Sequence, residues 1–449
     1  MKRCQFLKLS SALIIAPFAA PVQCDPSQEK LKNWAGNFEF STHNVHYPGS
    51  VEETQALVKK HSRLKTLGTR HCFNRIADSR DNLLSTKLLN NVVSINEQEL
   101  TVTVEAGIKY GELCPYLESK GYALHNLASL PHISVAGSVA TATHGSGLGN
   151  GNLAVPVNAI EMVIADGTVI QLSRKRDGET FLAAVVSLGA LGVVTKVTLD
   201  LQRTFSMRQH VFLNMPMAQV KNHFNEIITA GYSVSLFTDW QADLINEVWI
   251  KSLVATGTNF DGINDYFGAS AATVNVHPIE ALSAEHCTDQ MGVPGPWYDR
   301  LPHFKMGFTP SSGKELQSEY FVPVHHALEA IQAVSRLGKQ IEPHLFISEI
   351  RSIAADKFWM SPCYNQASVS IHFTWKQDWP AVSKLLPLIE KELEPFNVRP
   401  HWGKLFLLPA KTLASRYEKL PAFKELIRQY DPRQKFRNDF LTTQLYNGI

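Results

Sequence analysis

The chain carries almost no net charge. Its 449 residues include 43 Lys and Arg and 41 Asp and Glu, which gives a formal net charge of +2. It also has no Lys- or Arg-rich stretch and no zinc-finger spacing. Proteins that bind nucleic acid neutralise phosphates with a basic surface. The sequence therefore argues against nucleic acid as a partner.

Cysteine is scarce, with six residues in the whole chain, two of them within the first 24 positions. No two cysteines form a CxxC pair, so a structural zinc site is not expected. So few cysteines do not make a disulfide scaffold, although a single bridge stays open. We expect the cysteines beyond the N-terminal segment to be small buried hydrophobic residues. They are Cys72, Cys114, Cys287 and Cys363.

A run of about 20 apolar residues, the length that spans a bilayer, is missing. The most apolar segment, "SALIIAPFAAPV", is shorter and follows a basic start at Lys2 and Arg3. This pattern is typical of a secretory signal peptide, which we expect over residues 1–24, with a periplasmic or secreted location. "RCQFLK" resembles the twin-arginine export consensus, with Cys4 in place of the second arginine, so general secretion is the alternative route. An uncleaved N-terminal anchor is the other alternative.

The common nucleotide-binding motifs are absent too. No Walker lysine occurs, and no GxGxxG joins an early strand to a helix, which disfavours a nucleoside triphosphate or an ordinary dinucleotide fold. Two small-residue segments stand out instead, "GTRHCFN" at 68–74 and "SVAGSVATATHGSG" at 134–147. Small residues let backbone N–H groups approach a ligand closely, although such tracts are often plain loops or tight helix packing. Together the two segments could grip one pyrophosphate from both sides.

His71 lies in the glycine-led turn of the first segment. Its position allows a metal ligand, a general base, a cofactor attachment point or a buried imidazole. No second cluster of metal-ligating residues accompanies it in the sequence, and the local spacing does not decide among the other three.

The composition, 44% hydrophobic and 19% charged, is that of a globular protein long enough for two or three domains. Up to about residue 205, short helices and strands alternate, including an amphipathic helix at 51–60 and a hairpin at Asp166-Gly167. From about 206 to 400, aromatic strands are separated by long helices. The second pattern favours an antiparallel sheet backed by helices.

Polar residues recur at a period of two on two of these strands. Glu349 and Arg351 share one face of "SEIRS", and His372 and Thr374 share one face of "IHFTW". Such pairs are often solvent-facing ion pairs. Alternatively they line a polar cleft, in which a lysine in apolar surroundings can serve as a base. The polar residues that neighbouring segments add to this cleft are Gln317 and Lys404.

Together these segments carry a resemblance. "GTRHCFN", "NLASLPHISVAGSVATATHGSG", "EIR", "HFTW", "PHWGK" and "DPRQKFRNDF" resemble, in this order, the vanillyl-alcohol oxidase superfamily of flavoproteins. Within it, the chain from about residue 33 to 445 is similar to the aldonolactone oxidase and alditol (xylitol or sorbitol) oxidase branch. The resemblance implies the two-domain α+β fold of the VAO/PCMH type. An FAD-binding domain of two α/β subdomains (33–205) would be followed by a substrate or cap domain with a helix-backed antiparallel sheet (206–405). A C-terminal segment (406–449) would return to the FAD-binding domain.

The resemblance also implies the cofactor, FAD, joined covalently to His71 through the flavin 8α-methyl group. The loop around this histidine matches the one that holds the FAD pyrophosphate, and the second small-residue segment matches the second FAD-binding run. The matching residues are Leu67, Gly68, Thr69, Arg70, His71, Cys72, Asn74, Ser129, Ser134, Gly137, Ser138, Val139, Ala140, Thr143, His144 and Gly145, and Val193 and Val194 match the strand end that meets the adenosine half of the cofactor.

For catalysis, the resemblance implies that Lys404 takes the hydroxyl proton of the substrate while hydride leaves toward flavin N5. Arg351 would stabilise the negative charge that develops on oxygen, and Glu349 would orient Arg351 and a substrate hydroxyl. No metal is implied. The matching substrate-binding residues are Ser129, Gln317, Glu349, Arg351, His372, Thr374 and Lys404.

The sequence departs from the family pattern at two positions. Ala142 replaces a common glycine, and Cys72 replaces a usual serine after the histidine. Both exchange one small residue for another, so we expect the backbone contacts with the cofactor to be kept.

The expected function is oxidation of the terminal CH–OH of an alditol such as xylitol or sorbitol to an aldose, by a monomer, with O2 as acceptor and H2O2 as product. An aldonolactone (gulono- or galactono-1,4-lactone) oxidase or dehydrogenase, similar to D-arabinono-1,4-lactone oxidase, is the alternative. An exported carbohydrate-binding protein that keeps the flavin fold without turnover is an alternative of another class. Glu349, Arg351 and Lys404 together argue against it, because a binding protein needs no base. Ala128, where relatives control oxygen access, does not decide the acceptor.

Overall fold

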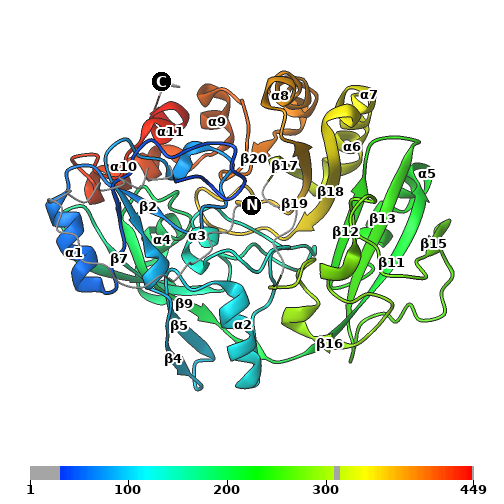
Figure 1. Cartoon of the computed structure of the whole chain (residues 1–449), viewed down its shortest axis with the longest axis horizontal. Helices are drawn as coiled ribbons and strands as arrows, with labels where there is room; N and C mark the ends of the chain where they lie inside the picture. Colours follow the sequence, from blue (N-terminus) through cyan, green and yellow to red (C-terminus); the bar gives the residue numbers. More distant parts are fainter. Residues whose placement is uncertain (1–30, 308–313, 447–449) are drawn as a thin grey trace, which may run out of the picture. The chain divides into compact units, whose positions relative to one another are not determined.

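The first sheet is small and parallel. It contains β1 (Val45–His46), β2 (Lys65–Leu67) and β3 (Leu83–Ser85). In the computed structural model (Figure 1), which describes residues 31–307 and 314–446, the order of its strands is β1-β3-β2. Helix α1 (Val51–Lys60) joins β1 to β2 and begins after Ser50, whose hydroxyl accepts a hydrogen bond from the backbone of Glu53. The helix predicted at 51–60 is confirmed, whereas the predicted export signal lies outside the described residues.

The second sheet is antiparallel. Its strands are β4 (Val92–Asn96), β5 (Thr101–Glu105), β7 (Val157–Val163), β8 (Val169–Ser173) and β9 (Val193–Asp200), and the nearby helices are α2 (Tyr110–Ser119), α3 (Val135–Val139) and α4 (Arg174–Val185). The strand order is β4-β5-β9-β7-β8. Strands β7 and β8 form the predicted hairpin, in which Gly167 adopts a φ of +87° that a residue without Cβ tolerates. Helix α4 packs on β7 and β8.

The largest sheet collects the strands between residues 206 and 400. They are β11 (Ser206–Pro216), β12 (Ser233–Thr238), β13 (Leu244–Leu253), β14 (Asp265–Tyr266), β15 (Ala269–Ala271), β16 (Gly295–Pro296), β17 (Glu315–Pro323), β18 (Leu345–Ile353), β19 (Ser368–Lys376) and β20 (Arg399–Pro400). Their order is β14-β15-β11-β13-β12-β18-β19-β17-β20, with β16 paired to β11, and every pair is antiparallel. A two-stranded sheet of β6 (Tyr122–Ala123) and β10 (Gln202–Arg203) precedes it in the chain.

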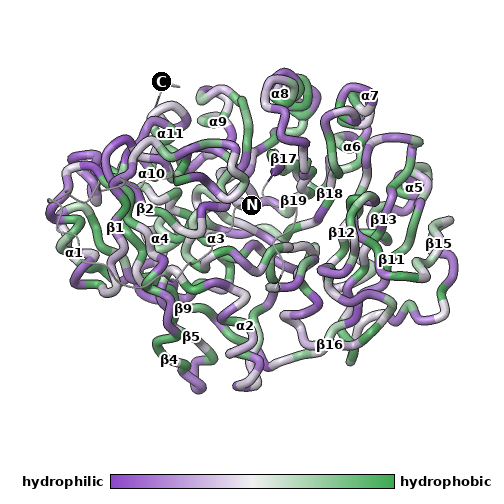
Figure 2. Tube along the Cα trace, viewed as in Figure 1, coloured by the Kyte–Doolittle hydropathy of each residue, from purple (hydrophilic) through white to green (hydrophobic). Residues whose placement is uncertain are grey.

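Helices cover one face of the large sheet. They include α5 (Met217–Ile228), α6 (Ala327–Ser335), α7 (Gly338–Ile341) and α8 (Trp379–Leu393). Helix α6 packs against β17, β19 and α8, and α8 carries both hydrophobic and hydrophilic residues along its turns (Figure 2). The hydroxyl of Tyr320 on β17 donates to Glu390 of α8 at 2.9 Å, so Tyr320 belongs to the helix-covered face. Because strand side chains alternate, Gln317 and Glu319 lie on the opposite face. The predicted α+β class and the helix-backed antiparallel sheet are confirmed.

The C-terminal segment lies against the first two sheets. It contains α9 (Ala410–Arg416), α10 (Leu420–Tyr430), α11 (Asp439–Leu441) and a π-helical turn (Thr442–Tyr446). The backbone N–H of Leu64 donates to the carbonyl of Lys435 at 3.0 Å, and that of Ala165 donates to Tyr430 at 3.2 Å. These bonds connect segments that are far apart in the sequence.

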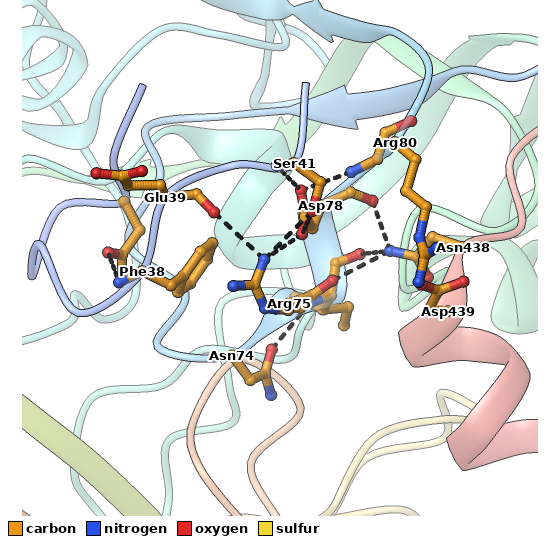
Figure 3. A network of polar contacts seen from close by, with 12 residues as sticks. Phe38, Glu39, Ser41, Asn74, Arg75, Asp78, Arg80, Asn438 and Asp439 are labelled. Carbon is orange, nitrogen blue, oxygen red and sulfur yellow. Dashed lines mark hydrogen bonds and ion pairs between the residues drawn. The ribbon is translucent and has the colours of Figure 1, made fainter. Parts of the chain in front are cut away.

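A polar network joins the same segment to the chain that follows the small-residue turn at 68–74 (Figure 3). The side-chain amide of Asn438 donates to the carbonyls of Arg75, Ile76 and Asp78 at 3.1, 3.0 and 2.8 Å. Its carbonyl oxygen accepts from the backbone N–H of Leu441 and so caps α11. One side chain therefore serves both the C-terminal helix and the turn after residue 74.

Replacing Asn438 with alanine is expected to lower the free energy of unfolding by about 2 kcal/mol, since a helix cap and a side-chain donor to three carbonyls are lost. Urea unfolding followed by circular dichroism measures the change. Asn222→Ala, at an exposed position of α5, is the matched control and is expected to change the midpoint little. Equal midpoints for both variants would remove this role of Asn438.

Neither a disulfide nor a membrane helix is found in the described residues. Cys114, Cys287 and Cys363 are buried, Cys72 is half-buried, and all four carry free thiols. Across residues 31–307 and 314–446, every helix is too short or too polar to cross a bilayer. The prediction that these cysteines are buried is thus confirmed for three of the four.

Candidate active site

One cavity brings the two small-residue segments together with the open face of the large sheet. All seven residues of the predicted substrate set line it. Fourteen residues of the predicted cofactor set also line it, namely Leu67, Gly68, Thr69, Arg70, His71, Cys72, Asn74, Ser129, Gly137, Ser138, Ala140, Thr143, His144 and Val194. The other four members of that set, Ser134, Val139, Gly145 and Val193, lie outside the lining.

His71 is held on a loop in an unusual backbone conformation. Arg70, the residue before it, adopts a φ of +65°, which non-glycine residues rarely do. Two contacts support this conformation: the carbonyl of Arg70 accepts from the backbone N–H of Trp34 at 2.8 Å, and the indole of Trp34 stacks on the His71 ring with centroids 5.2 Å apart. The loop therefore presents His71 to the cavity in one orientation.

The His71 imidazole is neutral, and only one of its two ring nitrogens has a hydrogen-bond partner among the described residues. Its Nδ1 lies 3.0 Å from the hydroxyl of Thr69, whereas its Nε2 is buried and has no hydrogen-bond partner among the described residues. Burial lowers the pKa of His71 to about 3. A neutral ring with a nitrogen free of protein partners is a competent nucleophile, and a buried polar atom of this kind calls for a ligand.

The two small-residue segments touch each other at the cavity wall. The backbone N–H of Ser134 donates to the Thr69 hydroxyl at 3.2 Å. A Cβ added at Gly68 would lie 2.9 Å from Ser134 Oγ, and one added at Gly137 would lie 2.8 Å from the same atom. A side chain at Gly68 would have to displace Ser134 Oγ of the other segment, and one at Gly137 would crowd Ser134 within its own segment. Ala142, where relatives often carry glycine, adopts a φ of +54°, so this substitution keeps a glycine-like backbone at a cost in strain of about 1 kcal/mol.

The His71 loop also holds the turn that carries Lys404. The backbone N–H of Phe73 donates to the carbonyl of Gly403 at 2.8 Å. The side-chain amide of Asn74 donates to the carbonyls of Trp402 and Lys404 at 2.8 and 2.7 Å. Asn74 is expected from the resemblance to bind the cofactor, and its side-chain amide donates both of its hydrogen bonds to this turn. The cofactor loop and the lysine turn therefore form one rigid unit.

The polar residues of the sheet face the cavity from three adjacent strands. Cross-strand pairing places Glu349 opposite His372, and His372 opposite Glu319 on the other side. The side chains of Glu349 and Arg351 are each 6% exposed, and Arg351 Nε lies 3.5 Å from Glu349 Oε1. The cleft alternative from the sequence is therefore confirmed over the solvent-facing ion pair.

Glu349 is held by a second partner from an irregular loop. His303 Nε2 lies 2.7 Å from Glu349 Oε1, and the backbone N–H of His303 donates to the carbonyl of Ser129 at 3.1 Å. Burial would raise the pKa of Glu349, but Arg351 and His303 outweigh it and keep that pKa far below its ordinary value. The carboxylate is ionised throughout the neutral range and can accept a hydrogen bond from a hydroxyl.

Lys404 lies at the edge of this polar face. Its Nζ donates to Glu319 Oε2 at 2.7 Å, and its side chain is 15% exposed. Burial lowers the pKa of Lys404, Glu319 opposes that change, and Arg351 adds to it, so the net pKa lies below the ordinary value of lysine. The amine is easier to deprotonate here than in water, as a general base requires.

Two residues of the polar face were missed in the sequence. Glu319 follows Gln317 by two positions on β17, so the period that placed His372 and Thr374 on one face could have found it. His303 comes from the irregular stretch between β16 and β17, where no periodic pattern exists to indicate which side chains face the cavity. Glu319, His303 and His401 all line the cavity.

The cavity suits a flavin better than a metal ion. Gly68 and Gly137 line the cavity where the two segments meet, and the buried Nε2 of His71 has no hydrogen-bond partner among the described residues. No group of three or more His, Cys, Asp or Glu side chains in the described part of the chain is arranged to hold a metal ion. The residues present thus fit a large planar cofactor with a phosphate-bearing tail.

Comparison with known proteins decides the family. The sequence matches the FAD binding domain family over residues 43–173 and the D-arabinono-1,4-lactone oxidase family over residues 303–444. The alditol oxidase of Streptomyces sp. (strain IKD472) is 45% identical over 415 residues, which cover 92% of this chain and 98% of that protein. The chain belongs to the family of FAD-dependent alditol and aldonolactone oxidases. L-gulono-1,4-lactone dehydrogenase of Mycobacterium tuberculosis is 27% identical over 433 residues, 91% of this chain and 97% of that one.

Solved structures agree on the fold. The cholesterol oxidase of B. sterolicum superposes with a TM-score of 0.75 at 14% identity and covers 96% of this chain and 100% of its own. A solvent-stable cholesterol oxidase superposes with a TM-score of 0.74 at 15% identity. The VAO/PCMH-type fold expected from the sequence is confirmed. The protein is an FAD-dependent oxidoreductase that acts on CH–OH donors.

Proposed function

We propose that the protein oxidises the terminal CH–OH of an alditol to the aldose. The observation that carries this proposal is a row of hydroxyl-binding groups beside Lys404. Ser129, Gln317, Glu349, His372 and Thr374 all line the cavity and come from the large sheet and the loop after β6. A substrate with many hydroxyls uses such a row, and a deoxy analogue would leave buried polar groups unpaired. The Streptomyces relative is an alditol oxidase, which supports the same substrate class.

Each charged residue near the reacting hydroxyl has a separate role in this proposal. Lys404, in its neutral form, takes the proton of the reacting hydroxyl. When bound, FAD supplies the two-electron acceptor for the hydride that leaves the same carbon. Arg351, fixed by Ser129 at 3.3 Å and by Glu319 at 2.9 Å, stabilises the negative charge that develops on the substrate oxygen. Glu349 accepts a hydrogen bond from a neighbouring hydroxyl and holds Arg351 in place.

The proposal includes the way in which the cofactor is held. The segments around Gly68 and Gly137 would cradle the pyrophosphate, and His71 would carry the flavin covalently. Support comes from the close approach of the two segments at Gly68 and Gly137 and from His71 Nε2, which has no hydrogen-bond partner among the described residues. The proposal also takes O2 as the acceptor that regenerates the oxidised cofactor, with release of H2O2.

Aldonolactone oxidation is the second candidate. The D-arabinono-1,4-lactone oxidase match spans residues 303–444 and so includes the whole polar face from Gln317 to Lys404. A lactone offers fewer free hydroxyls than an open-chain alditol, and its reacting carbon lies in a ring. An alditol and a lactone would therefore contact the same polar residues, but as molecules of different shape.

The function is tested by incubating the purified protein with xylitol, sorbitol or gulono-1,4-lactone and measuring peroxide. We expect peroxide with the alditols at well above the rate with the lactone, and none with 1,5-dideoxyxylitol, which lacks both terminal hydroxyls. Faster turnover of the lactone would establish the second candidate instead. Bleaching of the flavin by an alditol without peroxide would show that another acceptor replaces O2.

A further inference from the structure

We infer that Glu319 is a positioning residue that holds Lys404 and Arg351 together and controls the protonation of Lys404. The inference rests on the proposed role of Lys404 as the base. The period of two on β17 places Glu319 on the same face as Gln317, and the contacts of its carboxylate indicate its role.

The carboxylate of Glu319 is occupied on both oxygens by cationic groups. Its Oε2 accepts from Lys404 Nζ at 2.7 Å, and its Oε1 accepts from a terminal nitrogen of Arg351 at 2.9 Å. His144 Nε2 lies 3.0 Å from the same Oε1. Three segments that are distant in the sequence thus converge on one side chain.

Glu319 belongs to the cavity wall, but its carboxylate is covered by the side chains around it. Its side chain is 0% exposed, whereas the side chain of Lys404 is 15% exposed. A substrate hydroxyl can therefore meet Lys404 and Arg351 but not the carboxylate between them. Glu319 acts through these two residues, which is why it differs from Glu349.

The strand position of Glu319 makes this arrangement stiff. It lies on β17 between β19 and β20, and its carbonyl accepts from the backbone N–H of His401 at 3.0 Å. That bond fixes the start of the turn that carries Lys404. Both the side chain and the backbone of Glu319 therefore bind the lysine turn, and the position of Lys404 Nζ follows from β17.

The charges around Lys404 determine in which direction its pKa changes when the charge of Glu319 is removed. Glu319 on β17 and Glu349 on β18 favour the ammonium form, while Arg351 on β18 opposes it. Two further rings, those of His372 on β19 and His401 in the lysine turn, have pKa values far below that of free histidine because they are buried, so they are neutral at neutral pH. His144 is neutral for the same reason. Removing the Glu319 charge leaves Lys404 facing Arg351 without its nearest anion.

A base must be unprotonated to act, so the acid limb of the pH–rate profile reports the pKa of Lys404. In Glu319→Gln, the loss of the carboxylate lowers this pKa, and the acid limb of flavin reduction by xylitol moves to lower pH. An opposite charge at this distance shifts a pKa by about 1–3 units, so we expect a displacement of that size. We also expect a rate at the plateau about tenfold lower, because a neutral amide holds two cations less firmly than a carboxylate does.

Two variants serve as comparisons. Glu319→Asp keeps the charge on a shorter side chain, so the plateau falls while the acid limb stays at the wild-type pH. Glu390→Gln removes another buried carboxylate, one that binds Tyr320 on the same strand but does not contact Lys404. Its acid limb is expected at the wild-type pH.

A second measurement is independent of turnover. Competitive acetylation of the whole holoenzyme with acetic anhydride at a series of pH values, followed by mass spectrometry of the peptide that contains Lys404, reports when this amine loses its proton. In Glu319→Gln the midpoint is expected to fall in the same direction as the acid limb.

The measurements distinguish an error in the proposed function from an error in the role of Glu319. If wild-type protein is not reduced by any alditol, the proposed function is wrong, and the acetylation midpoints still test Glu319. If wild-type protein is reduced and Glu319→Gln shows the wild-type acid limb and the wild-type acetylation midpoint, the role of Glu319 is wrong while the function stands. If Glu319→Gln does not fold, a shift of the acid limb in Glu319→Asp toward lower pH would overturn the inference, since the charge is still present.

Discussion

Replacement of Lys404 by methionine is expected to give a folded, yellow protein that an alditol reduces about 10²–10⁴-fold more slowly than the wild type. Methionine fills a similar volume but cannot take the hydroxyl proton. The cradle around Gly68 and Gly137 is untouched, so FAD stays bound. Stopped-flow measurement of flavin reduction, with the visible spectrum as a check on cofactor content, determines the ratio.

Lys424→Met is the matched control for this change. Lys424 is also buried, on α10, but it lies over the ring of Tyr446 and does not line the cavity. We expect reduction at the wild-type rate. A wild-type rate in Lys404→Met would remove the lysine from the mechanism, and an equal loss in both variants would point to a general effect on folding.

Replacement of His71 by alanine is expected to abolish acid-stable flavin completely. In the wild type, the neutral imidazole with its unpaired nitrogen would form the bond, so precipitation with acid should leave the flavin on the chain. In His71→Ala no nucleophile remains at this position, and FAD is held only by the surrounding loops. Acid precipitation, followed by the absorbance of pellet and supernatant and by intact mass, measures the attached fraction.

His132→Ala provides the comparison. This histidine lies just before the second small-residue segment, is close enough to influence His71 electrostatically, and has its Nε2 2.8 Å from the carbonyl of Met306. Acid-stable flavin is expected to persist in this variant. Acid-stable flavin in His71→Ala would mean that another residue forms the bond.

Much of the fold followed from local patterns. The hairpin at Asp166-Gly167 and the helix at 51–60 were readable because turn chemistry and periodicity act over a few residues. The period of two on β18 and β19 also indicated that Glu349 and Arg351 share a face. What these patterns could not show is which side of the sheet the helices cover. That choice depends on packing between segments, as in the bond from Tyr320 to Glu390.

The contacts within the site were harder to predict from the sequence than the fold was. Asn74 is expected from the resemblance to bind the cofactor, and the structure uses its amide to hold the Lys404 turn, more than 300 residues away. His303 contacts Glu349 from a segment without regular structure, so no sequence pattern predicts this contact. Long-range contacts of this kind follow from tertiary packing, which a local pattern does not encode.

By itself, the sequence determined the family, the flavin cofactor, the α+β class and the chemical types of the residues in the site. It could do so because these depend on residue identity and on spacing within short segments. Only the tertiary structure decided that Glu349 and Arg351 face the cavity, that the His71 loop binds the Lys404 turn, and that Glu319 joins Lys404 to Arg351. The physical reason is that burial and charge pairing arise only where distant segments meet, and these set the protonation of Lys404.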